Sequence, residues 1–219
     1  MERIRTKKEF AYNPGDHVSR YIWVFDKIKG KVTLDAGCGE GYGTSWLRTN
    51  GINVLGVDCS RTAFKSSEKK GVIRGDILFM PFHSCKFDAI ISFEVIEHLK
   101  DGNMYLSQVS NLLKPHGIFL GSTPIRKKEK YLNDRPKNPF HKREYYIDEI
   151  KDLLEKHFEK VQIFGQIFPS KIKVIFLSQM NRLKIYRDQH KFYPIHMGIS
   201  PTDEKCLWIA KDPRKYTRE

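Results

Sequence analysis

The segment that organises this sequence is Asp35-Ala36-Gly37-Cys38-Gly39-Glu40-Gly41-Tyr42-Gly43. Its first two residues end a short apolar run, Lys31–Ala36, which we predict to be a strand. Its last two residues begin an amphipathic run, Tyr42–Asn50, which we predict to be a helix. The glycines permit a tight turn and let a ligand approach the backbone closely. A glycine-rich loop between a strand and a helix therefore predicts a ligand site at the carboxyl end of that strand.

Strand and helix patterns alternate on both sides of this loop. The predicted helices cover residues 17–28, 42–50, 60–69, 103–113 and 147–157, with weaker helical character at 172–181. The predicted strands cover residues 31–36, 52–57, 72–75, 88–93, 118–122, 160–164 and 206–211. This order predicts an α/β, Rossmann-like doubly wound sheet that is parallel through its first half.

The bulk properties are those of a globular protein. The chain has 219 residues, of which 40% are hydrophobic and 30% are charged. No apolar run is long enough to span a bilayer and no signal peptide is evident, so we expect a cytoplasmic protein without a membrane span. None of the four cysteines forms a CxxC pair, so we expect a reducing compartment and no metal site.

The positive charge of the chain is unevenly distributed. The formal net charge is +13, but residues 32–100 hold eight basic and eight acidic residues. The excess lies in the first eight residues, in the stretch 126–151 and in the last six residues. Two interpretations stay open: a surface that attracts a nucleic acid or other polyanion, or an ordinary solvated surface rich in lysine.

Two carboxylates indicate the kind of ligand. Asp35 precedes the first glycine, where a dinucleotide site would place a pyrophosphate near a helix N-terminus. A carboxylate there suits a cation such as an α-ammonium group. Asp58 ends the second predicted strand, where a carboxylate accepts hydrogen bonds from ribose hydroxyls. An amino-acid ammonium and a ribose together describe S-adenosylmethionine better than a nicotinamide dinucleotide.

Five segments in order resemble the motifs of the class I S-adenosylmethionine-dependent methyltransferases. They are residues 34–43, 56–58, 75–82, 87–99 and 112–120. The resemblance implies a mostly parallel seven-stranded sheet whose last strand is antiparallel, and S-adenosylhomocysteine as a product. It implies cofactor contacts from Asp35, Ala36, Gly37, Cys38, Gly39, Tyr42, Gly43, Asp58, Cys59, Asp76, Ile77, Phe93, Glu94, Val95 and His98.

The same resemblance suggests a division of the chain. Residues 1–30 would form an N-terminal arm and lid helix, and residues 31–219 the methyltransferase domain, with an insertion at 165–204 before the last strand. Two departures stand out. His116 occupies a position where members often have glycine, and the helix between the third and fourth strands is reduced to residues 83–86.

Three further elements resemble a subgroup found with bacterial and archaeal surface-glycan enzymes. They are His17-x-x-Arg20-Tyr21, Ser122-Thr123-Pro124 and Asn138-Pro139-Phe140-His141-x-x-Glu144. A weaker likeness extends to small-molecule O-methyltransferases of the quinone-pathway type. The resemblance implies a small-molecule or glycan acceptor, with lid or acceptor contacts from Tyr12, His17, Arg20 and Tyr21.

Methyl transfer to a hydroxyl requires removal of a proton, so a base is expected near the cofactor. Our first candidate is His141, oriented by Glu144, and the second is His98. Either histidine could instead be structural. Glu97 is predicted to be a surface or supporting carboxylate.

Other functions remain as alternatives. The basic flanks leave open the methylation of RNA or another nucleic acid, although no Asn/Asp-Pro-Pro-Tyr signature is present. A methyltransferase-fold subunit that binds without catalysing is a further alternative. A nicotinamide dehydrogenase is more remote, because it would not explain Asp35. The acceptor and the oligomeric state are not specified by the sequence.

Overall fold

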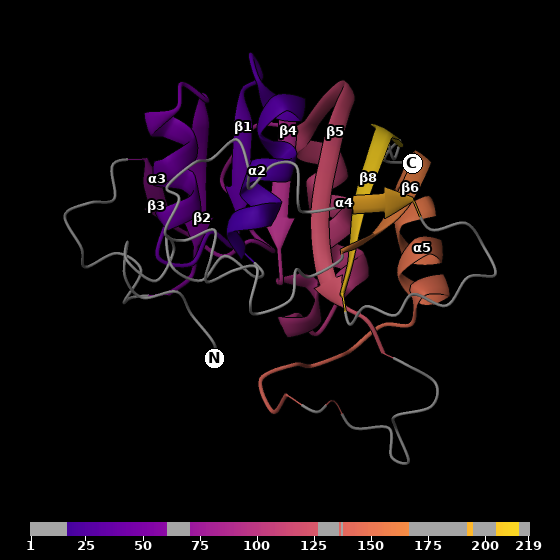
Figure 1. The fold of residues 1–219 in the computed structure, drawn as a ribbon. Helices are drawn as coiled ribbons and strands as arrows, with labels where there is room; N and C mark the ends of the chain where they lie inside the picture. The colour runs from indigo at the N-terminus through magenta and orange to yellow at the C-terminus, as the bar shows by residue number, and fades with distance from the viewer. Residues whose placement is uncertain are drawn as a thin grey trace.

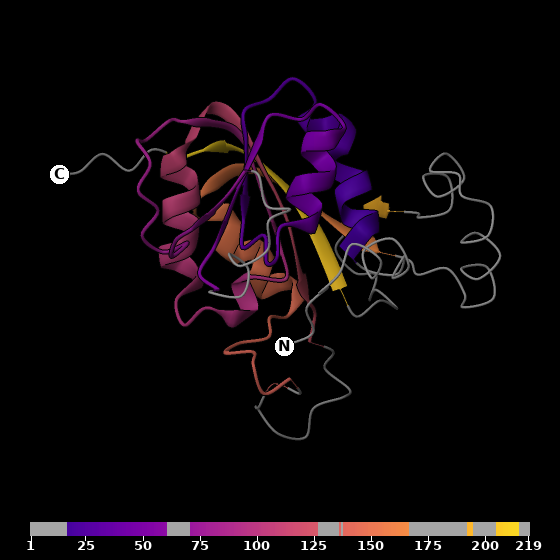
Figure 2. The same ribbon diagram turned by 90° about the vertical axis from the view of Figure 1, so that its left-hand side faces the viewer.

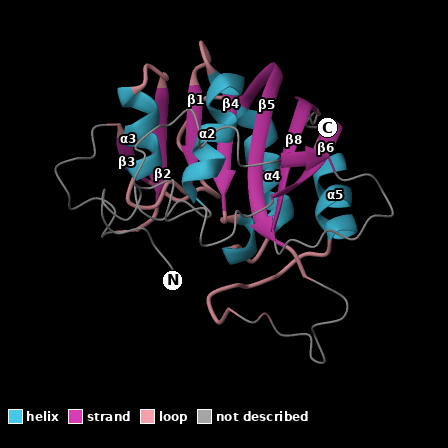
Figure 3. Ribbon diagram, in the orientation of Figure 1, coloured by secondary structure: helices cyan, strands magenta, loops and turns pink. Residues whose placement is uncertain are grey.

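The computed structural model describes residues 17–60, 71–126, 136, 138–166, 192–194 and 205–214. Its elements in chain order are α2 (His17–Ile28), β1 (Thr33–Ala36), α3 (Tyr42–Thr49), β2 (Val54–Asp58), β3 (Val72–Arg74), β4 (Phe87–Phe93), η1 (Ile96–His98), α4 (Gly102–Leu112), β5 (Leu113–Pro124), α5 (Ile147–Glu155), β6 (Phe158–Gln166), β7 (Phe192–Pro194) and β8 (Lys205–Pro213). Figure 1 shows their arrangement and Figure 3 marks helices and strands by colour.

One twisted sheet runs through the molecule in the order β3-β2-β1-β4-β5-β8-β6-β7. The five strands β3, β2, β1, β4 and β5 are parallel to one another. Strand β8 lies between β5 and β6 and is antiparallel to both. The predicted seven-stranded fold with an antiparallel last strand is confirmed. The short strand β7 adds an eighth strand beyond β6 at the edge.

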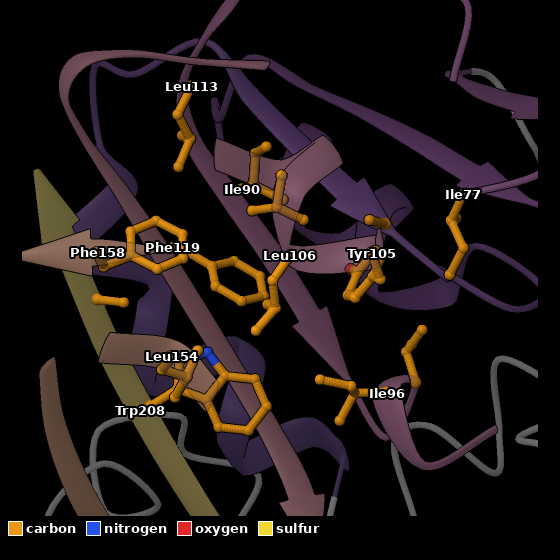
Figure 4. Packing of buried hydrophobic residues seen from close by; sticks show 14 of the residues in the cluster. Ile77, Ile90, Ile96, Tyr105, Leu106, Leu113, Phe119, Leu154, Phe158 and Trp208 are labelled. Atoms are coloured by element: carbon orange, nitrogen blue, oxygen red, sulfur yellow. The ribbon is translucent and has the colours of Figure 1, made fainter. Parts of the chain in front are cut away.

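Helices cover both faces of the sheet. Figure 2 shows α2 and α3 on one side and α4 and α5 on the other. The α4 and α5 side carries the larger core cluster, in which Tyr105, Phe119, Phe158 and Trp208 are buried (Figure 4). The indole of Trp208 lies over Gly121 of the neighbouring strand, and a Cβ atom at residue 121 would overlap it. Close packing of this kind fixes β8 against β5.

Most element boundaries lie near their predicted positions, with one large difference. β5 begins at Leu113, directly after α4, rather than at Ile118. The chain passes from helix to strand without a loop, and His116 has a left-handed φ of 61° in this stretch. Between β3 and β4 no helix forms among the described residues, as the short segment 83–86 predicts. The helices predicted at 60–69 and 172–181 lie almost entirely outside the described residues.

Candidate cofactor and acceptor site

The glycine-rich loop joins β1 to α3 through left-handed backbone. Gly37, Gly39 and Gly41 have φ angles of 78°, 58° and 79°, a region that side chains other than glycine rarely adopt. The amides of Gly37 and Cys38 donate to the carbonyl of Val57 at 2.8 and 3.1 Å, which ties the loop to β2. A Cβ atom on Gly37 would overlap the side chain of Val95. The sequence of this loop is therefore dictated by both backbone conformation and close packing.

A cavity of about 450 Å³ opens beside this loop at the carboxyl ends of β1 and β4. This volume lies in the usual range for small-molecule sites. Its wall is formed by His17, Tyr21, Gly37, Cys38, Gly39, Glu40, Tyr42, Gly43, Asp58, Cys59, Asp76, Ile77, Phe93, Glu94, Val95, Glu97, His98, Leu99, Pro124, Asn138 and His141. Every predicted cofactor residue except Asp35 and Ala36 is among them.

We call Gly37, Cys38, Gly39, Tyr42, Gly43 and Asp58 the glycine wall. Asp58 organises it, because its carboxylate accepts hydrogen bonds from the amides of Gly39 and Ser60, each at 2.8 Å. A carboxylate has roughly four acceptor positions. Two therefore remain for the hydroxyls of a ligand, which keeps the predicted ribose role of Asp58 chemically available.

Asp35 lies behind the glycine wall rather than at its mouth. Its carboxyl is 1% exposed and accepts hydrogen bonds from Thr44 Oγ1 at 2.6 Å and from Tyr21 Oη at 3.1 Å. Burial, opposed by these hydrogen bonds, raises its pKa to about 7. Tyr21 of α2 lines the cavity and covers this carboxyl, so the predicted ammonium contact would have to reach Asp35 past or through Tyr21.

Helix α2 also contributes a buried cation. Arg20 is fully buried, and its Nη1 lies 3.3 Å from Glu94 Oε1. Glu94 also accepts a hydrogen bond from Ser122 Oγ at 2.8 Å, and its φ of 56° is left-handed. Strained backbone of this kind concentrates at functional sites. Of the predicted lid residues, His17 and Tyr21 line the cavity, Arg20 supports its wall, and Tyr12 lies outside the described residues.

We call Glu97, His98, Asn138 and His141 the histidine wall. His141 Nδ1 lies 2.8 Å from Glu144 Oε1, and both side chains are more than nine-tenths buried. His141 Nε2 lies 3.1 Å from Nδ2, the side-chain amide nitrogen of Asn138. His98 Nδ1 lies 3.0 Å from the carbonyl oxygen of Phe140. The structure thus brings together the three side chains predicted as candidate bases or their partners.

Of the two predicted roles of Glu97, a surface or a supporting carboxylate, the surface role is wrong. Glu97 is fully buried, and Thr123 Oγ1 donates to its Oε2 at 2.9 Å. Burial, together with the nearby charge of Glu94, raises the pKa of this carboxyl well above its usual value. The carbonyl of Glu97 accepts hydrogen bonds from the amides of Lys142 and Arg143 at 2.7 and 3.1 Å, which fastens η1 to the segment carrying His141. The burial of Glu97 has no local signature, because these partners come from distant parts of the chain.

Comparison with known proteins finds a family match over part of the chain that lines this cavity. A methyltransferase domain family matches residues 34–121, which include the glycine wall, strands β2 to β4 and all of β1 except Thr33. This part of the chain is therefore similar to a methyltransferase domain. The match ends within β5, so the segment that carries Asn138, His141 and Glu144 lies beyond it.

Curated relatives and solved structures agree with the match. A protein of Mycolicibacterium smegmatis named as a probable S-adenosylmethionine-dependent methyltransferase is 35% identical over 143 residues, covering 64% of this chain and 56% of the relative. A ubiquinone biosynthesis O-methyltransferase of Coxiella burnetii is 30% identical over 121 residues, covering 52% of each protein. The chain thus spans about half the length of the curated relatives it matches.

A solved methyltransferase of Thermotoga maritima, described as a possible histamine N-methyltransferase, has a TM-score of 0.69 at 18% identity and covers 94% of both chains. That likeness concerns the fold. No helix among the described residues has the length and apolar character needed to cross a bilayer. The basic clusters at the two ends of the chain lie largely outside the described residues, so a polyanion partner stays a prediction.

Proposed function

We propose that this methyltransferase domain transfers the methyl group of S-adenosylmethionine to an oxygen or nitrogen atom of a small-molecule or sugar-type acceptor. The observation that carries the proposal is the His141–Glu144 pair, held at 2.8 Å, in the same cavity as the glycine wall. A cavity of about 450 Å³ also suits a small acceptor better than a polymer. Related proteins include a ubiquinone biosynthesis O-methyltransferase and a sterol 24-C-methyltransferase, whose names denote small acceptors.

The glycine wall and the histidine wall would have different roles in the reaction. The glycine wall would hold the cofactor, with Asp58 at the ribose and the methionine part near Glu94 and Val95. The reactive sulfonium belongs to the cofactor, so the protein has to align the acceptor and manage its proton. His141 Nδ1–H donating to Glu144 would leave the Nε2 lone pair available, where it now faces the Asn138 amide.

The proton balance is simple for a hydroxyl acceptor. The acceptor displaces the Asn138 amide and gives its proton to His141 Nε2, and Glu144 stabilises the imidazolium that forms. S-adenosylmethionine would supply the methyl group: the acceptor oxygen would bond to the methyl carbon as the carbon–sulfur bond breaks, and the electron pair of that bond would stay on sulfur. The products are a methyl ether and S-adenosylhomocysteine.

The test separates turnover from cofactor binding. His141→Ala should lower kcat by about 10²- to 10⁴-fold, the usual contribution of general acid–base catalysis, with an unchanged Kd for S-adenosylmethionine by calorimetry. His116→Ala is a matched control, because His116 is a surface histidine whose side chain is 91% exposed. Equal loss of binding and turnover in His141→Ala would sink the assigned role.

A further inference from the structure

Three potential metal ligands meet in the histidine wall. Glu97, His98 and His141 each offer a ligand atom, and these atoms lie within 4.8 Å of one another. All three residues line the cavity. The two chain segments that carry them are fixed to each other by the hydrogen bonds from Lys142 and Arg143 to the carbonyl of Glu97. The cluster is therefore a product of the tertiary fold.

The carboxylate of this cluster has an unsatisfied oxygen. Glu97 Oε1 is buried and has no hydrogen-bond partner among the described residues, whereas Oε2 is held by Thr123. A buried polar atom without a partner destabilises the fold by roughly 1–3 kcal/mol, and more when it is charged. Such an atom calls for an explanation. A bound cation would provide one, because it supplies the missing partner.

The two imidazoles are held as metal-binding histidines usually are. His141 Nδ1 contacts the carboxylate of Glu144, and His98 Nδ1 contacts the carbonyl of Phe140. A metal-ligating histidine almost always donates its other ring N–H to a carboxylate or carbonyl, which fixes the tautomer and the ring orientation. This arrangement leaves Nε2 as the ligand atom of each ring. The Asn138 amide, 3.1 Å from His141 Nε2, would have to give way.

We propose that Glu97, His98 and His141 bind one divalent transition-metal cation of the zinc class. Two imidazoles and one carboxylate form a donor set typical of catalytic zinc, which keeps a fourth position open. Imidazole ligands disfavour Mg²⁺ and Ca²⁺, which prefer oxygen. In a tetrahedral site the ligand atoms are about 3.4 Å apart, so the side chains would close slightly around the ion.

The cation would specify the acceptor, and this step rests on the proposed function. The open position would take a hydroxyl oxygen of the acceptor and lower the pKa of that hydroxyl, as zinc does for bound water. The proton passes to solvent, the oxygen attacks the methyl carbon, and the carbon–sulfur bond breaks with its electron pair on sulfur. With the ion bound, His141 acts as a ligand and the proton goes to solvent, and the proton transfer to His141 Nε2 proposed above applies to the metal-free site. The acceptor class narrows to hydroxyl compounds.

The experiment measures metal binding directly and needs no acceptor. The 219-residue chain, freed of metal by chelation, is titrated with Zn²⁺ by calorimetry and with Co²⁺ by visible ligand-field absorption. We expect one saturable ion per chain. His98→Ala, His141→Ala and Glu97→Gln should each weaken binding by more than about tenfold, and Glu144→Gln by about 10- to 100-fold. His116→Ala should bind like the unaltered chain.

Far-UV circular dichroism and the midpoint of chemical denaturation check that each variant is folded. The Kd for S-adenosylhomocysteine is a further check for His141→Ala and Glu144→Gln, because neither residue is a predicted cofactor contact. If Glu97→Gln fails to fold, the two histidine variants still decide the matter, because their side chains are less deeply buried. No saturable Zn²⁺ binding, or binding unchanged in both histidine variants, would overturn the proposal. Failure of the proposed function has a different signature, namely no binding of S-adenosylmethionine by the metal-free chain.

Discussion

The glycine wall and the histidine wall of one cavity are built on different principles. The glycine wall consists largely of backbone, with left-handed glycines from one short loop bound to Val57 and Asp58 of the adjacent strand. The histidine wall consists of side chains from η1 and from the segment after β5, held by Thr123, Phe140 and Glu144. A wall made of backbone suits a constant ligand. A wall made of side chains can change its ligand by a few substitutions.

The largest expected effect is on stability, from replacing Asp35, the buried carboxyl behind the glycine wall. Replacing Asp35 removes a carboxyl whose pKa burial raises from its ordinary value of 3.8 to about 7. Between these two pH values the folded chain binds more protons than the unfolded chain, so stability falls as pH rises from about 4 to about 7. Three pKa units correspond to at most about 4 kcal/mol. Asp35→Asn should remove this part of the pH dependence.

The free energy of unfolding is measured by chemical denaturation at about pH 4.5, 6 and 8. The variant and the unaltered chain should be similar in stability at the lowest pH, with the variant more stable at the highest. Because every other titratable group is present in both proteins, the difference between the two pH profiles reports on Asp35. Parallel pH profiles for the two proteins would contradict the assignment.

The close approach of Gly37 to Val95 is expected to be needed for cofactor binding. Gly37→Ala adds a Cβ atom that overlaps Val95 at a φ of 78°, so we expect S-adenosylmethionine to bind about a hundredfold more weakly, or 2.7 kcal/mol. Gly51→Ala is the matched control, since Gly51 has a φ of 83° and no heavy atom within 4 Å of its Cβ position. Both should lose roughly 1–2 kcal/mol of stability from the left-handed strain.

Only Gly37→Ala should lose cofactor affinity, as measured by calorimetry at one pH. Adding Val95→Ala to it should restore part of the affinity, because the overlapping side chain is shortened. Similar losses in the Gly37 and Gly51 variants would mean that strain, rather than close packing, limits the loop.

The same contrast explains what the sequence could predict. The glycine wall follows from adjacent residues, so its loop, Asp58 and nearly all of its lining were predictable. The types of side chain in the histidine wall were predictable, but the burial of Glu97 depends on Thr123 in β5 and on the fastening of η1 by Lys142 and Arg143. Likewise, the cover that Tyr21 places over Asp35 results from the docking of α2. Contacts between distant segments have no local signature in the sequence.

The smallest expected effect concerns Asn138, which separates two roles of the histidine wall. Asn138→Ala removes the amide beside His141 Nε2 and the acceptor that holds the Phe140 amide at 3.0 Å. The contact with His141 Nε2 has to break before the acceptor can bind, so its loss does not slow turnover. Loss of the hydrogen bond from Phe140 costs about 0.5–1.5 kcal/mol and loosens the segment that carries His141. The kcat/KM for the acceptor should therefore fall about tenfold or less, with cofactor affinity unchanged. Zn²⁺ affinity should stay the same or rise, because the amide competes for the Nε2 lone pair. If Asn138→Ala instead lowered Zn²⁺ affinity as much as His141→Ala does, Asn138 would be a metal ligand or would hold the ligands in place. The proposed set of three ligands would then be wrong.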